Sequence, residues 1–226
     1  MHLEIRQTKD GSNTLFVPDL NEHYHSVHGA LQESQHVFIT HGLEYVLAQK
    51  KDIKVLEIGF GTGLNAILTF PVALAQKAFI QYDTLEKHPL ADEVVQQLHF
   101  EQFILNPELL GYFRQLHNSP WNEPVDIIPY FTLQKIHETL EEFIVPSSYY
   151  DVIYFDAFAP DKQPELWTDA MFEKLYNATR PGGVLVTYCA KGSFKRSLKA
   201  AEFEVEALPG PPGKREMTRG VKPVGR

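Results

Sequence analysis

Hydrophobic and polar positions alternate along this chain in a way that predicts a regular series of strands and helices. Short apolar runs bounded by glycine, proline or polar residues are typical of buried strands. These runs cover residues 53–58, 79–85, 125–131, 151–155 and 183–189. Helix-compatible segments cover residues 64–76, 89–103, 133–143, 164–178 and 193–201. Strands that alternate with helices predict an α/β fold with a mostly parallel sheet covered on both faces.

The beginning of the chain departs from this alternation. Residues 3–8 and 13–17 flank a turn that contains Asp10 and Gly11, which is typical of a β-hairpin. A histidine-rich stretch follows, and then a helix-like segment over residues 29–49. The N-terminal part of the chain is therefore expected to be an extension made of a hairpin, a segment that closes over a pocket, and a helix.

The end of the chain also departs from the alternation. Residues 203–208 and 215–221 are strand-like, and the proline-rich connection between them is too short for a crossover helix. They therefore predict an antiparallel C-terminal hairpin. Together with the five runs before them, they make a sheet of seven strands. We expect residues 1–48 to form the N-terminal extension and residues 49–226 to form the main domain.

Composition places the 226-residue chain among packed globular proteins. Hydrophobic residues make up 43% of it and aromatic residues 12%, which argues against a disordered chain. A single cysteine, Cys189, excludes an internal disulfide framework. The most apolar stretch, residues 66–75, is too short to span a bilayer, and the N-terminus lacks an apolar signal region. We expect a cytoplasmic protein without a membrane partner.

The strongest local signal is a glycine-rich loop after the first predicted strand, with the sequence V-L-E-I-G-F-G-T-G-L-N over residues 55–65. Alternate glycines let the backbone approach a ligand closely, and the following helix adds free N–H donors. Dinucleotide-binding loops have the spacing G-x-G-x-x-G instead. The acid beside this loop suits a ligand with a cationic amine, such as S-adenosyl-L-methionine, and a tight strand-to-helix turn is the alternative. The cofactor-binding candidates are Glu57, Gly59, Gly61, Gly63, Leu64 and Asn65.

The loop resembles E/D-x-G-x-G-x-G, the first motif of class I S-adenosyl-L-methionine-dependent methyltransferases. Folds of this kind place an acid at the end of the second strand, where it binds the ribose hydroxyls. Glu86 follows the second predicted strand, 23 residues after Gly63, an interval that fits one helix and one strand. We therefore expect Glu86 to bind the ribose, and a solvated acid at a strand end is the alternative.

A narrower signal follows the fourth predicted strand, the sequence D-A-F-A-P-D-K-Q-P-E-L-W-T over residues 156–168. It resembles D-G-F-A-P-x-x-N-P-x-M-W-T in the methyltransferase domain of the tRNA 5-methylaminomethyl-2-thiouridine biosynthesis enzymes, the MnmC-type family. Ligands bind at the carboxyl ends of the strands in open α/β sheets. Asp156 is therefore expected where cofactor and substrate meet, and a helix or turn cap is the alternative for this residue.

The resemblance to this family extends over nearly the whole chain. Further matching segments lie at residues 24–38, 59–65, 86–90, 180–183, 193–203 and 213–217. Their combination is far more specific than any single motif. It implies a Rossmann-like class I methyltransferase fold, with S-adenosyl-L-methionine as the cofactor.

The resemblance also implies a substrate and a reaction. The substrate is a tRNA wobble uridine with an aminomethyl group on carbon 5, and its primary amine takes the methyl group from S-adenosyl-L-methionine. Asp156 is then expected to accept an N–H hydrogen bond from the amine and to orient its lone pair. Phe158 would wall the pocket or stack on the uracil, with a place in the core as the alternative. Tyr24 and His25 would line the pocket mouth.

Two features of the chain differ from the family pattern, and the spacing of its histidines differs from that of a metal site. Bifunctional members carry a second, FAD-dependent oxidase domain, whereas this chain ends at Arg226, so we expect a stand-alone methyltransferase without FAD. The family often has an acid near the end of the third strand that meets the adenine amine. Residues 132–134 hold no acid, so this contact is not assigned. The spacing of His23, His25 and His28 is not that of a zinc site, and no metal is predicted.

The net charge of −8 argues at first against a nucleic-acid partner, but the charge is unevenly placed. Residues 191–226 hold nine Lys and Arg against four Glu, a net charge of +5, whereas residues 1–190 carry −13. A basic C-terminal region fits a protein that contacts tRNA phosphates, and a solvated basic tail is the alternative. The candidate substrate-binding cations are Lys195, Arg196, Lys214 and Arg215.

Two other functions stay open at this point. The same fold could methylate a small-molecule amine, or it could bind RNA without turnover. The basic residues and the family resemblance favour the anticodon region of tRNA as the partner, and the pattern predicts no particular oligomeric state.

Overall fold

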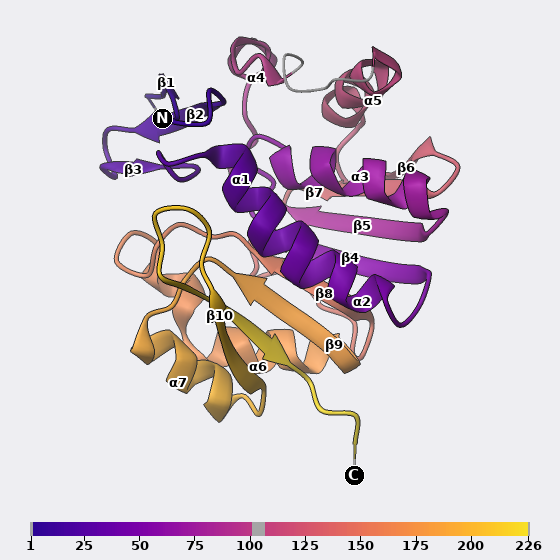
Figure 1. Ribbon diagram of the computed structural model, residues 1–226, viewed down its shortest axis with the longest axis vertical. Coiled ribbons are helices and arrows are strands. Elements are labelled where there is room, and N and C mark those ends of the chain that lie inside the picture. The colour runs from indigo at the N-terminus through magenta and orange to yellow at the C-terminus, as the bar shows by residue number, and fades with distance from the viewer. Residues whose placement is uncertain (1, 101–106, 226) are drawn as a thin grey trace.

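The computed structural model describes residues 2–100 and 107–225, and its centre is an eight-stranded sheet with helices on both faces (Figure 1). The strand order is β10-β11-β9-β8-β4-β5-β7-β6. The strands are β4 (Asp52–Ile58), β5 (Phe79–Leu85), β6 (Pro124–Ile128), β7 (Phe131–Ile136), β8 (Tyr150–Phe155), β9 (Thr179–Thr187), β10 (Glu204–Pro209) and β11 (Glu216–Val221). The five central strands run parallel, whereas β6 and the β10–β11 hairpin add antiparallel edges. The predicted α/β fold with its C-terminal hairpin is confirmed.

The sheet has eight strands rather than the predicted seven, because residues 125–143 fold differently from their expected pattern. The prediction of a single strand over residues 125–131 is wrong, since β6 ends at Ile128 and an antiparallel partner, β7, begins at Phe131. The predicted helix over residues 133–143 is also wrong, because its first third belongs to β7. Pro129 interrupts the apolar run, and a proline has no N–H group to contribute to a continuous sheet ladder.

Helices cover both faces of the sheet, but they follow the predicted alternation only in part, since no named helix lies between β7 and β8. They are α1 (Ala30–Ser34), a π-helical stretch η1 (Gln35–Leu43), α2 (Glu44–Leu47), α3 (Leu64–Gln76), α4 (Asp92–Gln97), α5 (Pro107–Asn118), the 3-10 helix η3 (Pro164–Trp167), α6 (Asp169–Ala178) and α7 (Gly192–Ala200). Only α4 falls within the helix predicted over residues 89–103, whose last three residues lie outside the described part. The helix α5 is not among the predicted elements.

Two hydrophobic cores form on opposite faces of the sheet, since successive strand residues point to opposite sides. Val55 of β4 packs with Phe38 of η1 and Phe70 of α3 in one core. Its neighbour Leu56 packs with Phe172 of α6 in the other core. β4 is therefore buried on both faces, as its continuous apolar run predicts.

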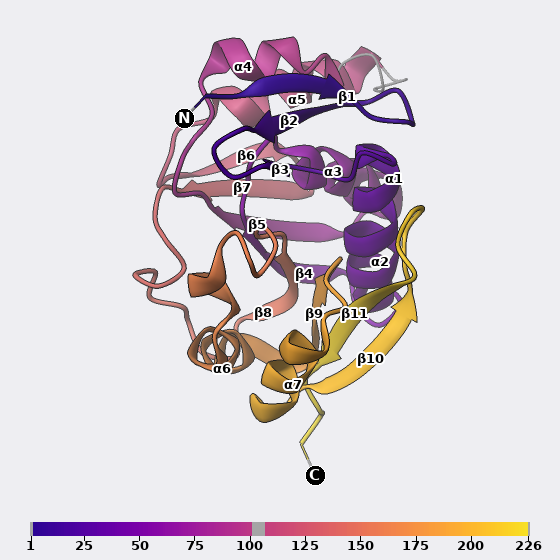
Figure 2. The ribbon, with the colours of Figure 1, turned by 90° about the vertical axis from the view of Figure 1, so that its left-hand side faces the viewer.

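The N-terminal strands form a separate three-stranded sheet beside α4 and α5 (Figure 2). Its strands are β1 (Glu4–Gln7), β2 (Asn13–Val17) and β3 (Glu22–His23). The predicted hairpin is confirmed by the antiparallel register of β1 and β2. The Asn13 side chain donates a hydrogen bond to the Leu98 carbonyl (3.0 Å), which joins this sheet to the end of α4. None of the described helices is long and apolar enough to cross a membrane.

Candidate functional site

A cavity of about 420 Å³ lies at the edge of the sheet where the parallel strands end. Backbone hydrogen bonds align the loops that follow these strands. The Gly59 N–H donates to the Leu85 carbonyl (3.0 Å), and the Asp156 N–H donates to the Ile58 carbonyl (3.1 Å). The loops after β4, β5 and β8 therefore meet at one place, which is the expected ligand position in an open α/β sheet.

Most of the residues that the sequence singles out come together at this cavity. Ten of them line it: Tyr24, His25, Gly59, Gly61, Leu64, Asn65, Glu86, Asp156, Phe158 and Lys214. The other candidates lie outside the lining: Glu57, Gly63, Lys195, Arg196 and Arg215.

The glycine loop gives the cavity a close backbone wall. A side chain on Gly59 would place its Cβ 3.0 Å from the Asp156 carbonyl oxygen, and one on Gly61 would lie 3.1 Å from the Tyr24 ring. Gly61 also has a φ of +51°, which disfavours residues with a side chain. These positions form a cradle that only the glycine backbone fits, as expected for a loop that holds a ligand.

A polar network connects the buried carboxyl group of Glu57 to the carboxyl group of Asp156 in the cavity lining. The side chain of Asn65 donates hydrogen bonds to Glu57 (3.0 Å) and to Asp156 (2.9 Å). The Thr84 hydroxyl donates to the other oxygen of the Glu57 carboxyl group (2.7 Å). Glu57 is fully buried. It therefore contacts Asn65, which is itself in the cavity lining, and it orients Asp156 through that amide.

Burial dominates the electrostatics of these two acids. It raises the pKa of Glu57 to about 8 and the pKa of Asp156 to about 7, although the hydrogen bonds from Asn65 act in the opposite direction. The charge of Glu33 raises the pKa of Asp156 further, and the charge of Lys214 lowers it. A cationic ligand group beside these acids would favour their charged forms.

Glu86 contacts the glycine loop from the end of β5. One carboxylate oxygen accepts a hydrogen bond from the Gly61 N–H (2.9 Å), and the other accepts from the His88 N–H (2.7 Å). The side chain is half-buried and lines the cavity. Glu86 is thus close enough to the glycine loop to share one ligand with it.

Aromatic and histidine side chains close the cavity on the N-terminal side. Tyr24 and Phe158 meet edge to face, with ring centroids 5.2 Å apart. His25 lies between Thr14 (Nδ1 to Oγ1, 3.2 Å) and Thr62 (Nε2 to Oγ1, 3.3 Å). Burial lowers the pKa of His25 to about 4, so the imidazole is neutral at pH 7 and joins β2 to the glycine loop. Within the described ranges, no group of three or more His, Cys, Asp or Glu could hold a metal ion.

Many residues of the lining are not among the candidates that the sequence suggests, and three of them bear on the chemistry of the site. Glu138 follows β7, because that strand ends at Ile136 and not at residue 131 as predicted for the third strand. The period-two burial of Phe131 and Leu133 is the signal that could have placed this strand correctly. Glu33 and Tyr188 also line the cavity. Glu33 lies in the family-like segment over residues 24–38, which gives it no role in the site, and no motif includes Tyr188.

The candidate phosphate-binding cations have different surroundings. Lys195 is paired with Glu216 (2.8 Å), and Lys214 is paired with Glu33. Arg196 and Arg215 are exposed, and neither has an ion pair with any residue in the described ranges.

Comparison with known proteins gives a consistent family. A family model described as S-adenosyl-L-methionine-dependent methyltransferase matches residues 130–223. The tRNA 5-methylaminomethyl-2-thiouridine biosynthesis bifunctional protein MnmC of Cupriavidus metallidurans is 31% identical over an alignment of 217 residues that covers 91% of this chain and 32% of that protein. The MnmC protein of Ralstonia nicotianae is 31% identical over 93% of this chain and 33% of its own length. The chain thus spans about a third of the length of these curated relatives.

Solved structures agree with the fold. MnmC2 from Aquifex aeolicus has a TM-score of 0.77 and 26% identity, and the match covers all of this chain and 72% of that one. Spermidine synthase from Thermotoga maritima has a TM-score of 0.58 over 98% of this chain and 72% of its own, but at 14% identity it supports the fold alone.

Proposed function

We propose that the chain belongs to the S-adenosyl-L-methionine-dependent methyltransferases and that it methylates the primary amine of 5-aminomethyl-(2-thio)uridine at the wobble position of tRNA. The product is the 5-methylaminomethyl nucleoside. The observation that carries this proposal is the half-buried carboxyl group of Asp156, which lines the cavity at the end of β8 and accepts a hydrogen bond from Asn65. The names of the MnmC relatives support the tRNA substrate.

The charge of the cavity supports cationic ligands. Its lining contains seven acidic side chains: Glu22, Glu33, Glu86, Glu138, Glu141, Asp156 and Glu165. The lining contains two lysines, and one of them is paired with Glu33. Such a surface favours a sulfonium or an amine over a phosphate group, because like charges repel across a cavity of low dielectric.

The described residues fit S-adenosyl-L-methionine. The cradle at Gly59 and Gly61 accepts close approach of a ligand, and Glu86 beside it is suited to the ribose hydroxyls. Glu138 follows β7 at the strand edge where an acid can meet the adenine amine. This residue would supply the acid that is missing from residues 132–134.

The cofactor supplies a methyl group on a positively charged sulfur. The role proposed for Asp156 is to accept an N–H hydrogen bond from the substrate amine, so that the nitrogen lone pair is oriented for reaction. A free alkylamine has a pKa of about 10.4, so the substrate amine must lose a proton before it can attack the methyl group. An acid whose pKa burial raises to about 7 is a better proton acceptor than an ordinary carboxylate. Tyr24 and Phe158 offer two rings that could hold the uracil.

The proposal extends to the setting of the reaction. We expect the anticodon region of tRNA to be the partner and the cytoplasm to be the location, because tRNA is used in translation there. We also expect residues 1–48 to act as an extension that closes the cavity of a domain formed by residues 49–226. The presence of Tyr24 and His25 in the cavity lining supports this role.

The test is methyl transfer from labelled S-adenosyl-L-methionine to two matched tRNA preparations. One carries 5-aminomethyl-2-thiouridine at the wobble position, and the other is the same tRNA without the aminomethyl group. We expect label only in the first, in a nucleoside with the mass of the methylaminomethyl product. Equal labelling of both preparations, or labelling of a free amine in preference to tRNA, would contradict the proposal.

A further inference from the structure

Lys214 lies in the turn between β10 and β11, but its side chain belongs to the cavity rather than to the outer surface. Its ammonium group is paired with the carboxylate of Glu33, a side chain that is only 8% exposed. The ammonium nitrogen also lies 3.9 Å from the ring centroid of Tyr188. The second oxygen of the Glu33 carboxylate accepts the Ser26 N–H (2.8 Å). Lys214 therefore reaches a buried acid that orders the N-terminal segment.

The same turn contacts the N-terminal segment at two further points. The Pro209 carbonyl oxygen lies 2.8 Å from His36 Nε2. Gly213 has a φ of +86°, and a Cβ at this position would lie 2.3 Å from the His28 ring. A glycine is needed there, because any side chain would separate the turn from His28. The C-terminal hairpin thus holds the segment that carries Tyr24 and His25.

Lys214 and Glu33 also determine the charge near Asp156. The Tyr188 ring lies under the ammonium group, and its hydroxyl donates a hydrogen bond to the carbonyl oxygen of Ala157 (2.8 Å). Ala157 directly follows Asp156 in the chain. The charged and titratable groups that act on Asp156 come from several elements: Glu33 of α1, Glu57 of β4, Tyr82 of β5, Tyr188 after β9 and Lys214 of the hairpin turn. Among these described groups, Lys214 is the cation.

We propose that Lys214 is a positioning residue of the methyl-transfer site, which closes the N-terminal segment over the cavity through Glu33 and supplies the positive charge that Asp156 faces. This role rests on the proposed amine methylation, and it differs from the phosphate contact that the sequence predicts for Lys214. Arg215, the next residue, is exposed and has no ion pair within the described ranges. It is therefore the matched control for a surface role.

The direction in which the pH profile shifts in each variant follows from the charge that the substitution removes. In Lys214→Met, loss of the cation should raise the pH at which activity reaches half its plateau by about one unit. In Glu33→Gln, loss of the anion should lower that pH. Both directions hold whether Asp156 or the amine loses the proton, since a nearby cation favours the deprotonated form of either group. Lys214→Arg should restore the wild-type profile in large part.

The first measurement is independent of turnover. The carboxyl carbon of Asp156 is followed by NMR during a pH titration of the protein alone, with Asp156→Asn used to assign the signal. We expect the midpoint to move up in Lys214→Met, to move down in Glu33→Gln, and to stay unchanged in Arg215→Met. Equal midpoints in wild type and Lys214→Met would overturn the inference, even if the enzyme methylates tRNA.

The second measurement separates a positioning role from a phosphate contact. Lys214→Met should lower kcat about tenfold at pH 7 while the KM for tRNA changes less than about threefold, as expected when only a transition-state interaction is removed. Arg215→Met should raise the KM for tRNA and leave kcat nearly unchanged. A higher KM and a smaller salt dependence in Lys214→Met, with an unshifted pH profile, would show that Lys214 contacts phosphate. If wild type labels no tRNA, the proposed function fails, and the NMR titration still decides the inference.

Discussion

At the scale of single residues, the site depends on one amide that orients two acids. Asn65 donates to both Glu57 and Asp156, so the motif acid of the glycine loop and the acid after β8 belong to one network. The glycine-loop motif selects Glu57 and Asn65, and the motif over residues 156–168 selects Asp156. Neither motif reveals their connection, because they lie on three different elements and meet only when the parallel strands are aligned.

The residue that this network orients gives the sharpest mutational prediction. Asp156→Asn should lower kcat by about 10²–10⁴-fold, because an amide cannot accept the proton of the amine. Affinity for S-adenosyl-L-methionine, measured by calorimetry, should change less than about tenfold, equivalent to about 1.4 kcal/mol. Asp161→Asn is the control, since Asp161 is exposed on the following loop and paired with Lys191. Full turnover by Asp156→Asn would refute the proposed role of Asp156.

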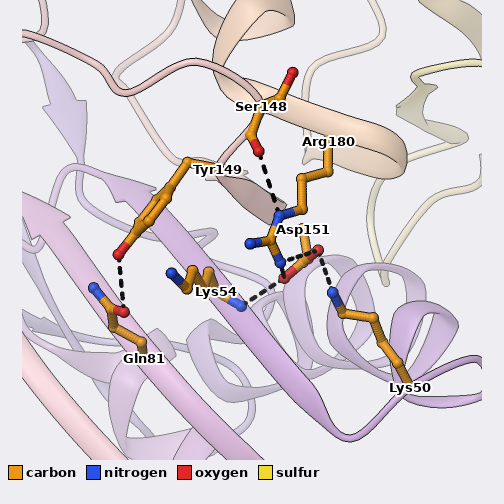
Figure 3. A network of polar contacts seen from close by, with 7 residues as sticks. All are labelled: Lys50, Lys54, Gln81, Ser148, Tyr149, Asp151 and Arg180. Atoms are coloured by element: carbon orange, nitrogen blue, oxygen red, sulfur yellow. Dashed lines mark hydrogen bonds and ion pairs between the residues drawn. The ribbon is translucent and has the colours of Figure 1, made fainter.

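At the scale of elements, β8 has an acid at each end with a different task. Asp156 follows its carboxyl end, and Asp151 lies near its start, at the opposite end of the strand. Figure 3 shows the polar contacts of Asp151. The Asp151 carboxylate, 5% exposed, accepts hydrogen bonds from Lys50 Nζ (2.6 Å) and from the Lys54 N–H (2.8 Å), and it is paired with Arg180 (3.3 Å). This network joins the end of α2 to β4, β8 and β9.

We therefore expect Asp151→Asn to affect stability and not catalysis. The substitution should lower the free energy of unfolding by about 1–3 kcal/mol, because it removes charged hydrogen bonds from a buried group. Denaturant melts measure this change, and kcat at 25 °C should stay near the wild-type value. Asp52→Asn, an exposed acid at the start of β4, should change stability by less than about 0.5 kcal/mol. A large decrease of kcat in a folded Asp151→Asn protein would contradict this assignment.

The elements also show where sequence patterns stop being informative. The limits of α3 and β5 agree with the prediction, because a glycine loop or a continuous apolar run marks them. The apolar alternation that begins at Phe131 and Leu133 is too short to define β7 by itself, because the buried Lys135 counts as a polar position. That lysine donates to the His117 carbonyl at the end of α5 (2.6 Å) and lies 4.9 Å from the Trp121 ring centroid. Tertiary contacts, not local pattern, make a buried lysine acceptable there.

At the scale of the whole molecule, the uneven charge is reduced by internal pairing. Arg226 lies outside the described residues, and four of the other eight C-terminal cations form ion pairs: Lys191, Lys195, Lys214 and Arg219. Arg196 and Lys199 of α7 and Arg215 of the hairpin turn are exposed, with no ion pair to another described residue. Because Lys195 contacts Glu216, α7 and the hairpin lie side by side and could present these cations on one surface.

This surface predicts the salt dependence of tRNA binding. Reversing Arg196 and Arg215 to Glu should weaken binding to every tRNA alike. It should also reduce the slope of log Kd against log salt by about one for each phosphate that the protein no longer neutralises. Filter binding between about 50 and about 300 mM salt measures the slope. Lys77→Glu is the control, since it lies after α3, away from the cavity edge. An unchanged slope in the double variant would place the RNA on another surface.

The sequence by itself determined the fold class, the glycine loop and the candidate acid at Asp156, because each depends on residues that are neighbours along the chain. A strand followed by alternate glycines and a helix needs no distant contact to be identified. Only the tertiary structure decided which groups share an environment. It moved the third parallel strand to residues 131–136 and brought Glu138 to the cavity. It also paired Lys214 with Glu33, 181 positions apart in sequence, since charge and burial arise from packing between elements.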